Sequence, residues 1–271
     1  MTKLREKTIW ITGASSGIGE ELTYQLAEKG NTIIISSRRA EELERVKRSC
    51  SNQSEDRIFV VPLDLDQLET IDAVAVKALE KHDVDVLINN AGVSQRSLAA
   101  ETDFEVDERI LRINYLSAVK LTKLVLPGMM QRKQGHIAVT SSLVGKFGTP
   151  YRSSYAASKH ALHGFFDALR AEVWSHNIKV TLFCAGYIKT NLSINALGKD
   201  GSIYNRMDRN QAKGKSAKNA AKAMINAIER DHMEVNFGGK EVLGTYLKRF
   251  APGLLFRAIR KMKINHVEEA S

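Results

Sequence analysis

Cysteines and long apolar runs are scarce in this chain of 271 residues. It holds only Cys50 and Cys184, and it has no run near the roughly 20 apolar residues that a membrane span needs. Two distant cysteines fit neither a disulfide framework nor a metal-ligand spacing, so we expect no metal site and a reducing, cytoplasmic compartment. The polar first seven residues lack the apolar segment of a secretory signal. Repeats, low-complexity tracts and linker-like stretches are also missing, which predicts a single domain over residues 1–271.

The composition is that of an ordinary water-soluble domain with a large core. Hydrophobic residues make up 43% of the chain and charged residues 26%. Short apolar runs alternate with helical patterns along the chain, which favours helices around a parallel sheet. The runs expected to be strands are 8–12, 31–37, 57–62, 84–88, 136–140, 179–184 and 233–237. The helical patterns include 67–81, 104–130 and 151–174. We therefore predict an α/β fold, a doubly wound Rossmann domain with a seven-stranded parallel sheet.

A glycine-rich turn joins the first expected strand to the first helical pattern. It reads Gly13-Ala-Ser-Ser-Gly17-Ile-Gly19, in which the glycines are spaced differently from the common Gly-x-Gly-x-x-Gly fingerprint. Backbone N–H groups at the start of a helix can hold a pyrophosphate, and glycine lets the ligand approach closely. Close packing of strand against helix would also favour glycine here.

The second strand ends where an NAD-binding unit normally places an acid for the ribose hydroxyls. Ser37 stands at this point and is followed by Arg38 and Arg39. Guanidinium groups bind phosphate through charge-assisted hydrogen bonds, so the pair favours the 2′-phosphate of NADP. The alternative is that both arginines pair with Glu41 and Glu42 on the exposed start of a helix.

Three residues suited to proton transfer follow the fifth strand. Tyr155 and Lys159 are four residues apart in a helical pattern, so they share one helix face, and Ser142 follows a strand that ends in a ligand-binding crevice. An ammonium about 4 Å from the phenol would favour its ionised form by about 4 kcal/mol at a dielectric constant of about 20, or about three pKa units. The pair thus predicts a tyrosine general acid or base. The alternative is a solvated lysine, a packing tyrosine and a turn-forming serine.

These motifs, taken in order, resemble the short-chain dehydrogenase/reductase family in its single-domain form. The resemblance covers roughly residues 7–237 and includes the glycine turn, Asp64, the Asn89-Asn90-Ala91-Gly92 run, Asn114, and Ser142 with Tyr155 and Lys159. Runs around Tyr155, Gly186 and Pro252 resemble the dehydrogenase/reductase member 7B group, a relative of the 11-beta-hydroxysteroid dehydrogenase branch. Ala185 replaces the family's usual proline before Gly186, and Ser16 stands where many NADP-preferring members carry a base.

The resemblance implies roles for individual residues. Tyr155 would exchange a proton with the substrate oxygen, Ser142 would hydrogen-bond that oxygen, Lys159 would hold the nicotinamide ribose and lower the pKa of Tyr155, and Asn114 would hold a water in a proton relay. The cofactor, NADP, would be bound by Gly13, Ser15, Ser16, Gly17, Ile18, Gly19, Arg38, Asp64, Leu65, Asn90, Ala91, Gly92, Tyr155, Lys159, Ile188 and Thr190.

Two segments fall outside these motifs. Residues 191–216 hold many polar residues and few apolar ones, which predicts an excursion over the ligand crevice. Residues 240–265 form a basic amphipathic segment that supplies most of the net charge of +9. Such a segment indicates a membrane-surface contact, a lid, an oligomer contact, or simply a docked helix pair with solvated lysines. No nucleic-acid recognition motif accompanies the charge, and we expect a homo-oligomer, either a dimer or a tetramer.

The sequence thus favours an NADP(H)-dependent oxidoreductase that interconverts a carbonyl and a secondary alcohol. Mostly apolar residues surround the expected site, which favours a steroid- or lipid-like substrate: Leu143, Val144, Phe147, Tyr151, Tyr187, Leu192, Ile194, Leu197 and Tyr204. An anionic substrate, such as a 3-oxoacyl thioester or an oxo acid, would instead be selected by Lys146, Arg152 and Lys189. A non-catalytic nucleotide-binding or scaffold protein is the alternative of a different class. The short remainder after residue 237 disfavours an epimerase or dehydratase.

Overall fold

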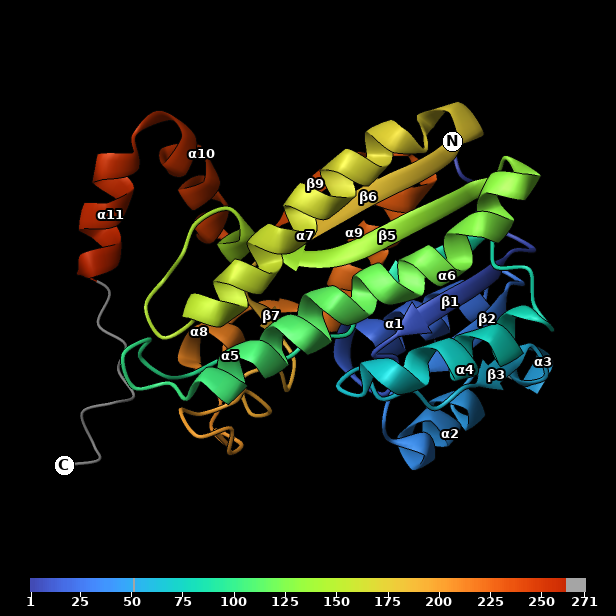
Figure 1. The fold of residues 1–271 in the computed structure, drawn as a ribbon, viewed down its shortest axis with the longest axis horizontal. Helices are drawn as coiled ribbons and strands as arrows, with labels where there is room; N and C mark the ends of the chain where they lie inside the picture. Colours follow the sequence, from blue (N-terminus) through green and yellow to red (C-terminus); the bar gives the residue numbers. More distant parts are fainter. Residues whose placement is uncertain (51, 262–271) are drawn as a thin grey trace.

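A computed structural model describes residues 1–50 and 52–261 of the chain (Figure 1). Its helices and strands alternate as the sequence predicted, and in order they are β1 Thr8–Thr12, α1 Gly17–Ala27, β2 Thr32–Ser36, α2 Ala40–Arg48, α3 Asn52–Glu55, β3 Ile58–Val60, α4 Leu68–Leu79, β4 Val86–Asn89, α5 Phe104–Leu111, α6 Ser117–Arg132, β5 Gly135–Ser142, α7 Ser153–Glu172, β6 Ile178–Ala185, β7 Ile188–Lys189, α8 Arg209–Ala212, β8 Lys215–Ser216, α9 Ala217–Glu229, β9 Glu234–Phe237, α10 Leu243–Phe250 and α11 Pro252–Arg260.

One seven-stranded sheet organises the molecule, with the strand order β3-β2-β1-β4-β5-β6-β9. Every neighbouring pair in it is parallel, which confirms the predicted doubly wound fold. The order reverses between β1 and β4. In open α/β sheets such a reversal creates a crevice at the carboxyl ends of the strands, where ligands bind.

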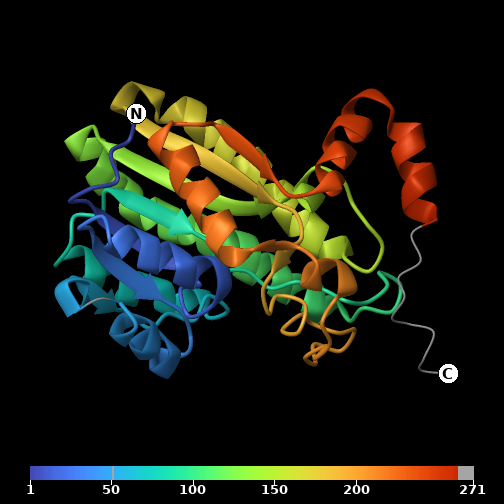
Figure 2. The same ribbon diagram turned by 180° about the vertical axis from the view of Figure 1, so that it is seen from behind.

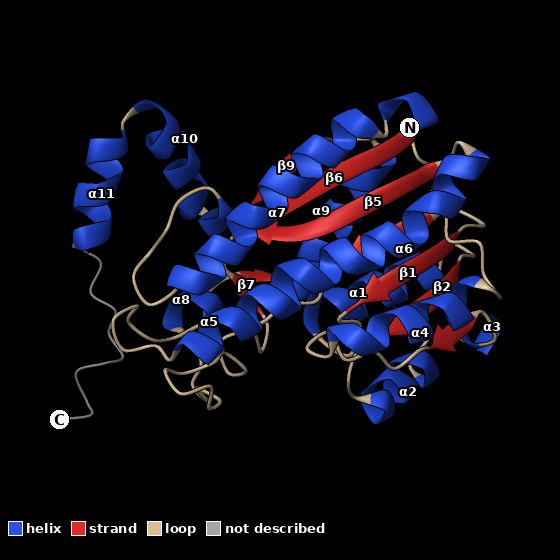
Figure 3. Ribbon diagram, viewed as in Figure 1, coloured by secondary structure: helices blue, strands red, loops and turns tan. Residues whose placement is uncertain are grey.

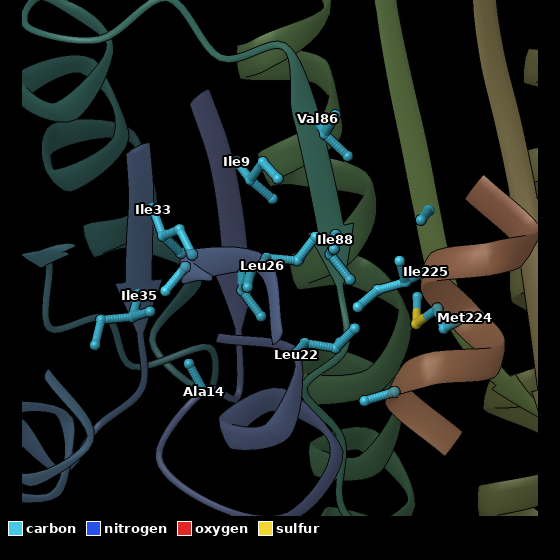
Figure 4. Close-up of a cluster of buried hydrophobic side chains, with 14 of the residues drawn as sticks. Ile9, Ala14, Leu22, Leu26, Ile33, Ile35, Val86, Ile88, Met224 and Ile225 are labelled. Carbon is cyan, nitrogen blue, oxygen red and sulfur yellow. The ribbon is translucent and has the colours of Figure 1, made fainter. Parts of the chain in front are cut away.

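Both faces of the sheet are covered by helices (Figure 3). Helices α4, α6 and α7 lie across the face seen in Figure 1, and α1 and α9 lie on the opposite face, seen in Figure 2. Successive side chains of a strand point to opposite faces, so Ile9 and Ile11 pack in one core and Trp10 packs in the other. Figure 4 shows the first core, where Leu22 and Leu26 of α1 meet Met224 and Ile225 of α9 over the strands.

The long helical pattern 104–130 is not one regular helix. A π-helical turn, Arg112–Leu116, separates α5 from α6. The helix expected over 151–174 begins at Ser153, because Tyr151 has a φ of 63° and Arg152 is also non-helical. Single π-helical turns are frequent at functional sites because they shift the side chains that follow.

Residues 191–216 contain more structure than expected. Helix α8 and strand β8 lie within this excursion, and β8 pairs with β7 outside the main sheet. Leu197 also forms bridges to Gln95 and Ile203. The excursion is therefore attached to the loop after β4 as well as to the segment after β6.

The last part of the chain forms two helices beyond the carboxyl edge of the sheet, α10 and α11 (Figures 1 and 2). Residues 262–265 of the predicted amphipathic segment lie outside the described residues. Leu255 and Ile259 of α11 pack with Leu143 and Phe147, whereas Phe250 is 81% exposed. None of the helices in the described part of the chain combines the length and the apolarity required to span a bilayer.

Candidate active site

Ser142, Tyr155 and Lys159 meet at the carboxyl end of β5. Ser142 is the last residue of that strand, as the sequence suggested. Tyr155 and Lys159 stand one turn apart near the start of α7, and all three side chains are buried. A strand end and a helix start have thus brought together the three predicted proton-transfer groups.

The Ser142 hydroxyl is fixed by the strand ends around it. Its Oγ donates to the backbone oxygen of Ala185 at 3.0 Å and accepts from the backbone N–H of Val144 at 3.4 Å. A hydrogen bond between Ser142 and Tyr155 lowers the pKa of the phenol. The serine is therefore oriented toward the tyrosine hydroxyl rather than acting as a free turn residue.

The pKa of Tyr155 is raised above its ordinary value, so the predicted lowering by Lys159 is wrong for this structure. Burial is the largest influence and raises it, against the hydrogen bond with Ser142 and the charges of Arg152 and Arg96. The Lys159 Nζ atom lies 5.8 Å from the centroid of the tyrosine ring and donates to the backbone oxygen of Thr140 at 2.8 Å. Burial has the opposite effect on the pKa of Lys159, which it lowers to about 8, because in both residues burial disfavours the charged form.

Asn114 lies in the π-helical turn and binds the loop that follows β4. Its Oδ1 accepts from the backbone N–H of Val93 at 2.8 Å, and its Nδ2 donates to the Val93 oxygen at 2.9 Å and to the Ser158 hydroxyl at 3.0 Å. The side chain thereby links this loop to α7, next to Lys159. A role in proton relay stays a prediction.

The glycine-rich turn between β1 and α1 forms a close-packed cradle. Gly13 and Gly17 have φ values of 67° and 61°, which favour glycine. A Cβ atom on Gly19 would lie 2.3 Å from the backbone oxygen of Gly13, and one on Gly17 would lie 3.1 Å from Thr190. Thr190, predicted to contact the carboxamide of the cofactor, therefore faces the turn predicted to hold its pyrophosphate.

The two arginines after β2 lie beside this turn. Arg39 Nη2 donates to the Ser15 hydroxyl at 3.2 Å, and both arginines line the same cavity as the turn. Neither takes part in the ion pairs found within residues 1–50 and 52–261; Arg45 is the residue that pairs with Glu42. The alternative in which Arg38 and Arg39 are held by Glu41 and Glu42 is thus not what the structure shows.

A single cavity of about 1380 Å³ joins the glycine turn to the proton-transfer groups. Of the predicted site residues, Gly19 and Asn114 do not line it. Those that line it are Gly13, Ser15, Ser16, Gly17, Ile18, Arg38, Asp64, Leu65, Asn90, Ala91, Gly92, Ser142, Tyr155, Lys159, Ile188 and Thr190. Its length and its two unlike ends suit a dinucleotide at one end and a second molecule at the other.

The second end of the cavity only partly matches the predicted substrate pocket. The expected residues Tyr151, Ile194 and Tyr204 do not line it, whereas Leu143, Val144, Phe147, Tyr187, Leu192 and Leu197 do. Several lining residues were not assigned to the pocket by the sequence analysis: Arg96, Leu243, Leu247, Leu255 and Ile259. The apolar face of the basic segment could have indicated from the sequence that the residues between Leu243 and Ile259 line the pocket. Arg96, isolated in a loop, gave none.

Comparison with known proteins gives this geometry its context. The sequence profile described as short chain dehydrogenase matches residues 7–201. The chain belongs to the short-chain dehydrogenase family. A Mus musculus relative named dehydrogenase/reductase SDR family member 7B is 42% identical over 261 residues, which cover 94% of this chain and 80% of the relative. An Anopheles gambiae protein named dehydrogenase/reductase SDR family protein 7-like is 42% identical over 264 residues, covering 95% and 83%.

The fold also matches solved structures of the family. The crystal structure of a short-chain dehydrogenase from Streptomyces avermitilis has a TM-score of 0.81 and 27% identity, with 97% of this chain and 100% of that chain covered. The predicted resemblance to short-chain dehydrogenases and to the member 7B group is confirmed. This short-chain dehydrogenase is therefore an oxidoreductase with a small-molecule substrate and a nicotinamide cofactor, for which the glycine cradle leaves room.

Proposed function

We propose that this short-chain dehydrogenase is an NADP(H)-dependent oxidoreductase that interconverts a carbonyl and a secondary alcohol on a hydrophobic substrate. The observation that carries the proposal is the single cavity on which Ser142, Tyr155 and Lys159 meet, continuous with the glycine turn and Arg38. A non-catalytic protein of the same fold would have no need to keep three buried polar groups on the wall of one cavity, because burying them costs free energy.

The nicotinamide supplies the hydride, and the chain's residues handle the proton. Tyr155 keeps its proton at neutral pH because burial raises its pKa. Its hydroxyl can therefore donate to the oxygen of a carbonyl. The Ser142 hydroxyl donates to Ala185 in this structure, so it would add a second hydrogen bond to the same substrate oxygen by turning its proton away from Ala185. Lys159 has a pKa of about 8, and its Nζ atom lies 5.8 Å from the centroid of the tyrosine ring, so it is the group that we propose returns a proton to Tyr155.

The preference for NADP over NAD rests on Arg38 and Arg39. Both line the cavity beyond the end of β2, where the ribose hydroxyls of a bound dinucleotide are expected, and the residue before them is Ser37 rather than an acid. Arg39 is oriented toward the turn by its hydrogen bond to Ser15. Two guanidinium groups without carboxylate partners in the described part of the chain favour a phosphate over a hydroxyl.

The hydrophobic substrate is supported by the walls near Ser142. Apolar residues come from three segments, namely the turn after β5, the excursion and the C-terminal helices: Leu143, Val144, Phe147, Leu192, Leu197, Leu243, Leu247, Leu255 and Ile259. Two of the three basic residues considered for an anionic substrate point elsewhere, since Lys146 pairs with Glu234 and Lys189 is exposed. Arg152 does line the cavity.

The experiment is a screen of apolar ketones and aldehydes for NADPH oxidation, followed by the Tyr155→Phe variant on any accepted compound. We expect the phenylalanine variant to bind NADPH normally and to lose at least about a hundredfold in kcat, because only the transferable proton is removed. Tyr115→Phe is the matched control, since Tyr115 packs edge-on against Phe165. Wild-type kcat in Tyr155→Phe would refute the mechanism.

We also propose that the two C-terminal helices contact an anionic membrane surface, so that the enzyme is peripheral to a membrane facing the cytoplasm. Phe250 and Leu254 are 81% and 59% exposed, and Lys248, Arg249 and Arg257 lie on the same two helices. An exposed apolar patch with basic neighbours is typical of surface-binding helices. We also propose that the protein forms a homo-oligomer, and light scattering measures its oligomeric state directly.

Sedimentation with phosphatidylserine vesicles tests the membrane contact. We expect the wild type to sediment with them and a Phe250→Ser, Leu254→Ser variant to stay in solution. Trp174→Ser is the control, because Trp174 is 77% exposed but lies just beyond the far end of α7. Equal sedimentation of all three proteins would contradict the proposal.

A further inference from the structure

Three charged side chains from distant parts of the chain, Arg96, Arg152 and Asp208, meet beside the cavity near Tyr155, and the two arginines line it. Asp208 Oδ2 accepts from Arg152 Nη2 at 2.9 Å and from Arg96 Nη2 at 3.4 Å. Arg96 follows β4, Arg152 precedes α7, and Asp208 is the N-cap of α8. Their side chains are only 7%, 14% and 14% exposed.

The charges of this cluster do not balance. Burial lowers the pKa of Arg96 to about 10, with the neighbouring Arg152 adding to the effect, so Arg96 stays charged at neutral pH. Two positive charges and one carboxylate leave one positive charge in excess. A poorly solvated excess charge is unfavourable unless an anion neutralises it.

The excess charge faces the cavity through Arg152. Arg96 Nη1 already donates to the Ser94 hydroxyl at 2.9 Å and to the backbone oxygen of Gln95. The guanidinium of Arg152 makes one hydrogen bond to the described part of the chain, through Nη2, and its central carbon lies 5.6 Å from the ring centroid of Tyr187. Its Nε and Nη1 atoms are left to bind what enters the cavity, which both arginines and Tyr187 line.

Both guanidinium groups also lie close enough to the proton-transfer group to act on it. After burial and the hydrogen bond with Ser142, the charges of Arg152 and Arg96 are the influences on the pKa of Tyr155, which they lower. Arg96, Arg152 and Tyr155 also line the same cavity, so one molecule can reach both Arg152 and Tyr155.

We propose that Arg96 and Arg152 form a carboxylate-binding subsite, and that the substrate is a carbonyl compound with an apolar body and one carboxylate. This inference rests on the proposed carbonyl chemistry and narrows its substrate class. A carboxylate brings the single negative charge that the cluster lacks, and its oxygens can accept a charge-assisted hydrogen bond from the free Nε or Nη1 atom of Arg152. The apolar residues of the same cavity receive the rest of the molecule.

The competing explanation is that the cluster only fastens the excursion. Asp208 Oδ1 accepts from the backbone N–H groups of Asn210 and Gln211, so the two arginines also attach α8 to the body of the protein. Fastening alone predicts that a substitution in the cluster weakens binding of neutral and acidic ligands to the same extent. A subsite predicts a loss that is specific for the acid.

Calorimetric titration of the NADP-loaded protein with octanoate and with octan-1-ol separates these explanations without requiring turnover. We expect the wild type to bind octanoate at least about tenfold more tightly, which corresponds to about 1.4 kcal/mol. In Arg152→Gln the ratio should fall to about one through a loss of octanoate affinity, and Arg152→Lys should recover part of it. Asp208→Asn, which keeps an N-cap side chain, should preserve or increase the ratio.

Arg132→Gln is the matched control, because Arg132 pairs with Asp83 at the end of α6, outside the cavity. It should leave the ratio unchanged. Equal affinity of the wild type for octanoate and octan-1-ol, or equal losses of both ligands in Arg152→Gln and Asp208→Asn, would overturn the subsite.

Turnover of oxo acids and their methyl esters then distinguishes the two proposals. Reduction of the esters with no preference for the acids would refute the subsite and leave the carbonyl chemistry standing. Tight octanoate binding without NADPH oxidation for any oxo acid or ester would refute the carbonyl chemistry, and with it the substrate class inferred here.

Discussion

Lys159→Met should make the cofactor-free protein more stable at neutral pH while it abolishes activity. The ammonium of Lys159 is buried, and burial lowers its pKa from 10.5 to about 8. This difference corresponds to about 3 kcal/mol of unfavourable free energy in the folded state at pH 7, at about 1.4 kcal/mol for each pKa unit. Methionine fills a similar volume without the charge, although the backbone oxygen of Thr140 loses a hydrogen bond worth about 1 kcal/mol. We expect a net gain of about 2 kcal/mol.

The stability gain of Lys159→Met should decrease as the pH rises. A lysine with a lowered pKa destabilises the folded state fully below about pH 8, and the penalty disappears as the pH rises toward 10.5. Chemical unfolding of the wild type and of Lys159→Met at pH 7 and pH 9.5 should show the advantage of the variant shrinking by about 2 kcal/mol. Lys123→Met, at an exposed position of α6, is the control and should show no such change.

A Lys159→Met protein that is less stable than the wild type at pH 7, or equally more stable at both pH values, would contradict this prediction. Either result would mean that the ammonium is better solvated or better paired than its hydrogen bond to Thr140 indicates. In both cases the loss of NADPH oxidation on any accepted ketone is still expected, because the group placed to return a proton to Tyr155 is gone.

Three further substitutions test other parts of the site. Gly19→Ala should lower NADPH affinity at least about tenfold in fluorescence titration, because its Cβ would lie 2.3 Å from the Gly13 oxygen; unchanged affinity would contradict the cradle. Replacing Ser37 with Asp and Arg38 with Gln should invert the preference for NADPH over NADH, measured as the ratio of kcat/KM values, and equal use of both by the unmodified protein would count against it. Asn114→Ala should lower the melting temperature by a few degrees as well as kcat, since the amide holds both backbone groups of Val93; an unaltered melting temperature would show that those bonds contribute nothing.

The parts of the fold that follow from local spacing were predictable. Strand, glycine turn and helix are contiguous in the sequence, and Tyr155 and Lys159 share a helix face because they are four residues apart. Ser142 could be placed near them because the carboxyl ends of parallel strands meet at one edge of a sheet. These features need no knowledge of how distant segments pack.

Other features depend on that packing and left no pattern to read. Arg96 and Arg152 are 112 and 56 residues away from Asp208 in the chain, and the sequence around each arginine does not indicate the contact. The pKa of Tyr155 was misjudged because a pairwise charge estimate omits burial, which here outweighs the charges. Similarly, the π-helical turn around Asn114 interrupts an apolar pattern that looks continuous in the sequence.

The outer wall of the cavity is built separately from its chemical end. Ser142, Tyr155 and Lys159 belong to β5 and α7, within the doubly wound body, whereas Leu247, Leu255 and Ile259 belong to two helices beyond the sheet. Substitutions on the cavity-facing side of α10 and α11 can reshape the volume offered to a ligand without moving a proton-transfer group. Substitutions in the final two helices can thus change the range of substrates, while the proton-transfer residues and the reaction stay the same.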